Sequence, residues 1–118
     1  MKGRKESKGE KRIRLFLESA GIEYISEMKF DMKVNKPIPF DFYLPNHNIC
    51  IEYNGRQHYE KTLFSRYDLK KRQKNDQIRV NYCKKMGILL IVIGYWQYNS
   101  IENILTNILS QLPVIGRF

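Results

Sequence analysis

Residues 37–60 read PIPFDFYLPNHNICIEYNGRQHYE and form the part of the sequence that decides the fold. Apolar and polar side chains alternate before and after residues 45–48, which is typical of two half-buried strands joined by a tight turn. That turn would impose the opposed pairs Leu44–Ile49, Phe42–Ile51 and Asp41–Glu52. Like charges in directly opposed positions destabilise a sheet, so Asp41 and Glu52 need a reason to be there. A divalent cation is the simplest reason, because Mg²⁺ is commonly held through one or two carboxylates.

The composition indicates one basic domain of ordinary size. The chain has 118 residues and a formal net charge of +9, from 21 Lys and Arg against 12 Asp and Glu. This excess favours nucleic acid as a partner before an anionic membrane surface, and a basic surface without a specific partner is the alternative. Cys50 and Cys83 have no CxxC or CxxH spacing, so we interpret them as reduced core thiols and not as a disulfide framework or a zinc site. Without a signal peptide or an apolar run long enough to cross a bilayer, we expect a cytoplasmic protein with no membrane partner.

Periodicity and capping signals predict the element order α-β-β-β-α-β-α for a single domain, residues 7–118, after a basic flexible tail at residues 1–6. Ser7 and Glu10 have the capping-box spacing, which starts the first helix. The apolar run 88–93 lies between two glycines and is typical of a strand buried on both faces. A strand that follows a helix in this way favours a mixed central sheet flanked by helices. The expected elements are helix 8–20, strands 22–30, 38–44 and 49–54, helix 66–86, strand 88–93 and helix 101–112.

The long helix 66–86 combines an apolar stripe with polar interruptions. Its expected inward apolar side chains are Leu69, Val80, Cys83 and Met86. Gln73 and Asp76 interrupt this stripe, and polar side chains at such positions point into a polar site or meet partners there. For Asp76, a local ion pair with Arg79 is the alternative. Glu10 also has two interpretations, because capping alone would explain its identity, whereas in the functional interpretation its carboxylate also reaches the metal site.

The element order, together with Asp41 and the later motif Glu52-x-Asn54, resembles the PD-(D/E)XK nuclease superfamily. That superfamily has an α-β-β-β-α-β core and the signature Asp … Glu/Asp-x-Lys. The phrases FDFYLP, IEYNGRQHY and DQIR are more similar to its very-short-patch-repair-endonuclease-like branch, which includes small phage-encoded and homing-type endonucleases. The resemblance covers about residues 7–105. It implies a restriction-endonuclease-like α/β fold and a Mg²⁺- or Mn²⁺-dependent DNA endonuclease of a phage or mobile element, which nicks DNA or cuts both strands.

The resemblance also implies roles for the matching positions. Asp41 would be the central metal ligand, Glu52 would add a second carboxylate or orient a metal-bound water, and the backbone carbonyl of Tyr53 would complete the inner shell. His58 would act as a general base or contact a phosphate, since its unperturbed pKa of about 6.5 suits proton transfer near neutral pH. The expected catalytic residues are Asp41, Glu52, Asn54, Gln57, His58, Glu10 and Asp76. The expected DNA contacts are Arg56, Lys70, Lys71 and Arg79, although a run of lysines on a helix is ordinarily a solvated face.

Asn54 departs from the motif. The superfamily usually has Lys at this position and the closer branch often has Asp, whereas Asn is neutral and supplies neither charge. A non-catalytic nucleic-acid-binding module that retains the nuclease fold is therefore one alternative, and a DNA junction resolvase is another. With one active site per chain, double-strand cleavage would need a homodimer or two successive nicks.

Overall fold

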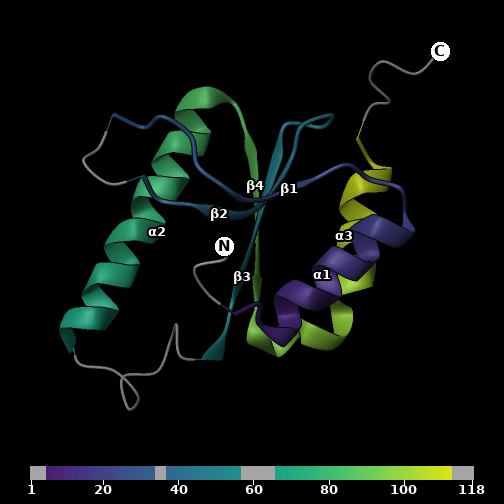
Figure 1. The fold of residues 1–118 in the computed structure, drawn as a ribbon, viewed down its shortest axis with the longest axis horizontal. Coiled ribbons are helices and arrows are strands. Elements are labelled where there is room, and N and C mark those ends of the chain that lie inside the picture. Colours follow the sequence, from purple (N-terminus) through teal and green to yellow (C-terminus); the bar gives the residue numbers. More distant parts are fainter. Residues whose placement is uncertain (1–4, 34–36, 57–65, 113–118) are drawn as a thin grey trace.

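The computed structural model describes residues 5–33, 37–56 and 66–112. Its elements in chain order are α1 (Lys8–Ser19), β1 (Ile25–Met28), β2 (Phe40–Leu44), β3 (Ile49–Asn54), α2 (Arg66–Met86), β4 (Leu89–Gly94), η3 (Tyr95–Ser100) and α3 (Ile101–Ser110). Apart from the short 3₁₀ helix η3, this is the predicted order. The strands form one mixed sheet flanked by helices (Figure 1), which confirms the α/β class. None of the described helices is both long and apolar enough to cross a membrane.

Helix α1 begins at the predicted capping box. The Glu10 N–H donates to the Ser7 Oγ at 3.2 Å, and the Ser7 N–H donates to the Glu10 Oε1 at 2.9 Å. Gly21 ends the helix with a φ of 69°, a left-handed conformation that glycine adopts without steric strain. The Ile22 N–H still donates to a carbonyl of the last helical turn at 2.9 Å. Because Ile22 belongs to this turn, β1 is shorter than the predicted strand 22–30.

The hairpin of β2 and β3 has the predicted register. Phe42 lies opposite Ile51, and Leu44 lies opposite Ile49. The turn closes at Asn48, whose φ is 57° and whose N–H donates to the Leu44 carbonyl at 2.8 Å. Prolines near the start of β2 have no N–H to donate to a ladder, so the strand begins later than predicted. The turn chemistry at one end of the hairpin therefore determines which side chains meet at the other end.

The sheet has the order β1-β2-β3-β4, with β3 and β4 parallel and the other neighbours antiparallel. Helices α1 and α3 cover one face, and α2 lies on the other (Figure 1). The larger apolar cluster, beneath α1 and α3, contains Ile13, Leu17, Phe42, Leu44, Ile49, Ile51, Ile91, Ile93, Ile101 and Leu105. The smaller cluster, beneath α2, contains Phe40, Cys50, Cys83 and Ile88. Both cysteines are buried free thiols, as predicted.

Strand β4 differs from its prediction as a strand buried on both faces. Ile91 and Ile93 are buried, but the Leu89 and Val92 side chains are 44% and 48% exposed. The reason is the position of β4 at the edge of the sheet, where it pairs with β3 on one side only. An edge strand lacks the second neighbour whose side chains would cover it, so a continuous apolar run does not ensure burial on both faces.

Candidate active site

Elements α1, β2, β3 and α2 meet around an open cavity of about 330 Å³. Helix α1 contributes Glu10, β2 contributes Asp41, and β3 contributes Glu52 and Asn54. The other lining residues are Pro39, Tyr53, Arg72, Asn75, Asp76 and Arg79. Acids that the sequence analysis selected from four separate parts of the chain therefore lie around one cavity.

Asp41 and Glu52 link the two hairpin strands just beyond the Phe42–Ile51 pair. The Asp41 N–H donates to the Glu52 Oε2 at 2.7 Å, and the Tyr53 N–H donates to the Asp41 Oδ2 at 2.8 Å. Each carboxylate thus accepts a backbone N–H of the opposite strand, a charge-assisted bond that orients it. The two acids are close together as predicted, but side-chain-to-backbone bonds connect them instead of a further regular ladder pair.

Burial and like charge raise the pKa values of this pair. For Asp41 burial is the largest cause, followed by the charges of Glu52 and Glu10, and its pKa rises from 3.8 to about 8 although the Tyr53 N–H opposes the change. Burial also raises the pKa of Glu52 to about 7, against the opposing effects of Arg79 and the Asp41 N–H. Carboxyl groups that hold their protons this tightly indicate a site with too little positive charge, which a bound cation would supply.

Glu10 both caps α1 and lines the acidic cavity, and its contact with a metal stays a prediction. Its side chain accepts the Ser7 N–H in the helix cap, and the same side chain lines the acidic cavity. After burial and the charge of Glu52, the charge of Glu10 contributes to the raised pKa of Asp41. The capping box therefore not only starts α1 but also fixes an acid next to the hairpin.

Arg79 balances part of the acidic charge from the side of α2. Its side chain is only 16% exposed, and its Nε donates to the Pro39 carbonyl at 2.9 Å and lies 3.9 Å from the Glu52 Oε2. Its Nη1 donates to the Asp76 Oδ1 at 3.1 Å, which is the local ion pair considered for Asp76. These contacts place Arg79 at the edge of the cavity beside Glu52, and its predicted contact with DNA stays a prediction.

The other predicted site residues fall into two groups. Asn54 is buried and lines the cavity, whereas Arg56, Lys70 and Lys71 are exposed. The remaining predicted site residues, Gln57 and His58, lie outside the described residues, so their roles stay predictions.

Arg72 and Asn75 also line the cavity, although the sequence predicted Arg72 only as part of a basic run and did not predict Asn75 at all. They precede Asp76 on α2 by four residues and by one, so Arg72 lies on the same helix face. The observed inward face runs through Leu69, Arg72, Asp76, Arg79 and Cys83. Three positions of the predicted stripe, Gln73, Val80 and Met86, are exposed instead. Helical spacing counted from the buried Cys83 would have found this polar face.

The donor set fits a divalent cation held by two carboxylates. In the described part of the chain, no group of three or more His, Cys, Asp or Glu side chains is arranged to hold a metal ion. Mg²⁺ needs only one or two protein carboxylates, because it keeps several waters. Asp41 and Glu52 meet that requirement: they are adjacent, largely buried and short of compensating positive charge. They remain the predicted metal ligands, with the Tyr53 carbonyl as a third.

Comparison with known proteins adds a viral relative. No known family profile matches the chain, and no solved structure matches it. The chain is 36% identical over 78 residues to "Uncharacterized protein 094L" of Frog virus 3 (isolate Goorha), which corresponds to 63% of this chain and 50% of that protein. The matched segment thus spans about half the length of this relative, and the chain is similar to part of a viral protein.

Proposed function

We propose that this protein is a divalent-cation-dependent DNA endonuclease of the PD-(D/E)XK type. The observation that carries the proposal is the pair Asp41 and Glu52, which two neighbouring strands hold together in a cavity despite their like charge. A mixed sheet flanked by helices, with α1 before the hairpin and α2 and β4 after it, is compatible with that family's core. Buried groups with strongly perturbed pKa values in a cleft are a physical indication of a functional site.

Asp41 and Glu52 would hold Mg²⁺ or Mn²⁺. Such a cation supplies positive charge beside a phosphodiester and makes water nucleophilic near neutral pH. The chain's own residues prepare this site: the Tyr53 N–H orients Asp41, and the Asp41 N–H orients Glu52. Because these donors are fixed backbone groups, little reorganisation is needed when substrate binds.

The side chain of Arg79 supports Glu52 from the side of α2. Arg79 lies beside Glu52 and is itself held by the Pro39 carbonyl and by Asp76. Asn54 lines the same cavity and offers a neutral amide that can hydrogen-bond a phosphate oxygen or a water. His58 remains the proposed proton acceptor.

The substrate class follows from charge. The chain carries a net charge of +9, and Lys70 and Lys71 are exposed on the α2 helix that also lines the cavity. Cations of this kind contact phosphates without reading sequence, and they make binding depend on salt. The charge therefore favours a nucleic acid, and the resemblance to DNA endonucleases makes DNA the proposed polymer.

Plasmid cleavage with Mg²⁺ or Mn²⁺ tests the proposal. We expect the wild type to nick or linearise the plasmid, and we expect Asp41→Ala and Glu52→Ala to lose this activity, while EDTA abolishes it in the wild type. Equal cleavage by all three proteins would reject the assigned site. Parallel reactions on branched and linear duplexes distinguish a junction resolvase from a nuclease acting on ordinary DNA.

The second candidate is a nucleic-acid-binding module without activity, and Asn54 favours it. This residue is buried in the cavity but carries no charge. In that case salt-sensitive DNA binding would occur without cleavage under any divalent cation, and Asn54→Asp would not produce cleavage. Cleavage by the wild type would exclude this candidate.

A further inference from the structure

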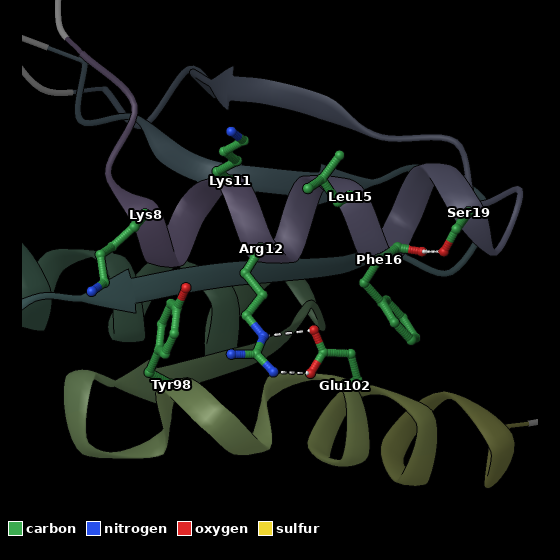
Figure 2. A pocket seen from close by; sticks show the side chains of 8 residues that line it. All are labelled: Lys8, Lys11, Arg12, Leu15, Phe16, Ser19, Tyr98 and Glu102. Carbon is green, nitrogen blue, oxygen red and sulfur yellow. Dashed lines mark hydrogen bonds and ion pairs between the residues drawn. The ribbon is translucent and has the colours of Figure 1, made fainter.

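A second and larger concavity lies between α1 and the η3–α3 segment, with a volume of about 770 Å³. Its lining residues are Lys8, Lys11, Arg12, Leu15, Phe16, Ser19, Tyr98 and Glu102. Figure 2 shows Tyr98 standing between Lys8 and Arg12, with Glu102 on the far side of the arginine. We call this surface the α1–η3 groove. The proposed catalytic site uses none of its residues.

Two cations and one acid face this groove, and a third cation, Lys11, lines its rim and extends away from Tyr98 (Figure 2). The Arg12 Nε and Nη2 donate to the Glu102 carboxylate at 2.7 and 3.0 Å, and its Nη1 donates to the Asn99 Oδ1 at 3.1 Å. These bonds hold the guanidinium in place and neutralise one charge. Lys8 and Lys11 are exposed, and neither has an ion-pair partner among residues 5–33, 37–56 and 66–112. The groove therefore retains an excess of positive charge.

The Tyr98 ring lies against two of the cations, Lys8 and Arg12. The Lys8 Nζ lies 5.1 Å from the centre of the ring, and the Arg12 Cζ lies 4.7 Å from it. Both distances are in the range of cation–π contacts. With Lys8 and Arg12 beside it, the ring is poorly placed to stack a nucleic-acid base. The chemistry of the groove is therefore that of a phosphate site and not of a base pocket.

The α1–η3 groove adjoins the acidic cavity through Tyr53. Tyr53 lines the cavity, and its ring packs so closely on Gly9 that a Cβ at Gly9 would collide with it. The Tyr98 hydroxyl is near enough to contribute to the raised pKa of Tyr53, although burial is the larger cause. On the first turns of α1, Lys8 faces the groove and Glu10 faces the acidic cavity. The two sites are thus neighbours on either side of one aromatic side chain.

We propose that the α1–η3 groove binds the phosphodiester backbone of DNA next to the position of cleavage, an assignment of the polymer that rests on the proposed function. The physical reason is electrostatic. Four carboxylates, Glu10, Asp41, Glu52 and Asp76, surround the acidic cavity and repel a phosphate unless cations nearby attract the flanking backbone. The groove supplies those cations without contacts to base edges, so its contribution is independent of sequence.

Salt-dependent binding tests this proposal. The probe is a fluorescently labelled DNA duplex, measured by anisotropy in EDTA so that no cleavage occurs. The double variant Lys8→Ala/Lys11→Ala is compared with Lys84→Ala/Lys85→Ala, which removes the same charge from the exposed last turn of α2. Log K falls as log salt rises, and each lost phosphate contact lowers the magnitude of this negative slope by about 0.9. We therefore expect the groove variant to lower the magnitude of the slope by about 1–2, and the control pair to leave it unchanged.

The outcomes are separable. Equal slopes for the groove variant and the control pair, with both proteins folded by circular dichroism, overturn the groove assignment. Lys8→Arg/Lys11→Arg keeps the charge and is expected to show the wild-type slope. If the arginine variant binds DNA as weakly as the alanine variant, charge is not what the groove contributes, and the phosphate site is contradicted. If the groove variant weakens DNA binding but the wild type never cleaves DNA, the nuclease proposal fails and the groove assignment stands. If cleavage requires Asp41 while the slopes are equal, the reverse holds.

Discussion

Asp41→Asn is expected to stabilise the metal-free protein at high pH. The amide keeps the size of the side chain and an oxygen that can accept the Tyr53 N–H, but it removes a charge buried beside Glu52 and Glu10. One pKa unit corresponds to about 1.4 kcal/mol. A rise from 3.8 to about 8 therefore means that ionised Asp41 lowers the free energy of unfolding by at most about 6 kcal/mol. Replacing a charged acceptor by a neutral one weakens the Tyr53 bond by about 1–2 kcal/mol. The net gain at pH 9 is therefore at most about 4–5 kcal/mol, and we expect about 2–4 kcal/mol because water in the open cavity screens part of the charge.

The sign of the pH dependence follows from the raised pKa. Between pH values of about 4 and 8, the folded protein keeps the Asp41 proton and the unfolded chain has lost it. Stability of the wild type therefore falls as the pH rises through this window, because the folded state binds more protons. Asp41→Asn has no proton to lose at this position. Its gain in stability over the wild type is therefore smallest near pH 4 and largest above pH 8.

Thermal unfolding in EDTA at pH 4.5 and pH 9 measures the effect. For a domain of this size about 1 kcal/mol shifts the melting temperature by roughly 4 °C, so the variant should melt roughly 8–16 °C above the wild type at pH 9. The matched control is Asp31→Asn, at a side chain that is 81% exposed, and it should not change the pH dependence. A variant that melts at or below the wild type at pH 9 would refute the reasoning. Mn²⁺ should raise the melting temperature of the wild type more at pH 9 than at pH 4.5.

Three further predictions concern the residues around this pair. Arg79→Met should lower the free energy of unfolding by about 3–5 kcal/mol in urea titrations, because it leaves Glu52 buried without its cation, and a loss below 1 kcal/mol would show that Arg79 does not orient this acid. Gly9→Ala should destabilise the protein by about 1–3 kcal/mol through collision with the Tyr53 ring, and an unchanged melting temperature would contradict that packing. Glu10→Gln should keep the helix cap and be about 1 kcal/mol more stable than Glu10→Ala, because the amide still accepts the cap N–H; equal stability of the two variants would argue against the cap.

Much of the fold was predictable because its signals are local. The Ser7–Glu10 capping box starts α1, and residues 45–48 form the hairpin turn that sets the register of β2 and β3. Each depends on atoms only a few residues apart, so the sequence pattern contains most of the necessary information. The closeness of Asp41 and Glu52 followed from the same turn. The family resemblance and the roles of Gln57 and His58 stay predictions.

The sequence by itself determined the order of the elements, the hairpin register and the basic charge of the chain. Only the tertiary structure decided that β4 lies at a sheet edge, that Arg79 turns inward to Glu52, and that Glu10 meets Asp41 across two elements. It also decided that Lys8 and Arg12 of α1 gather around Tyr98 of η3. The physical reason is that these arrangements depend on how helices rotate and pack on the sheet, which is set by many long-range apolar contacts at once and not by any local motif.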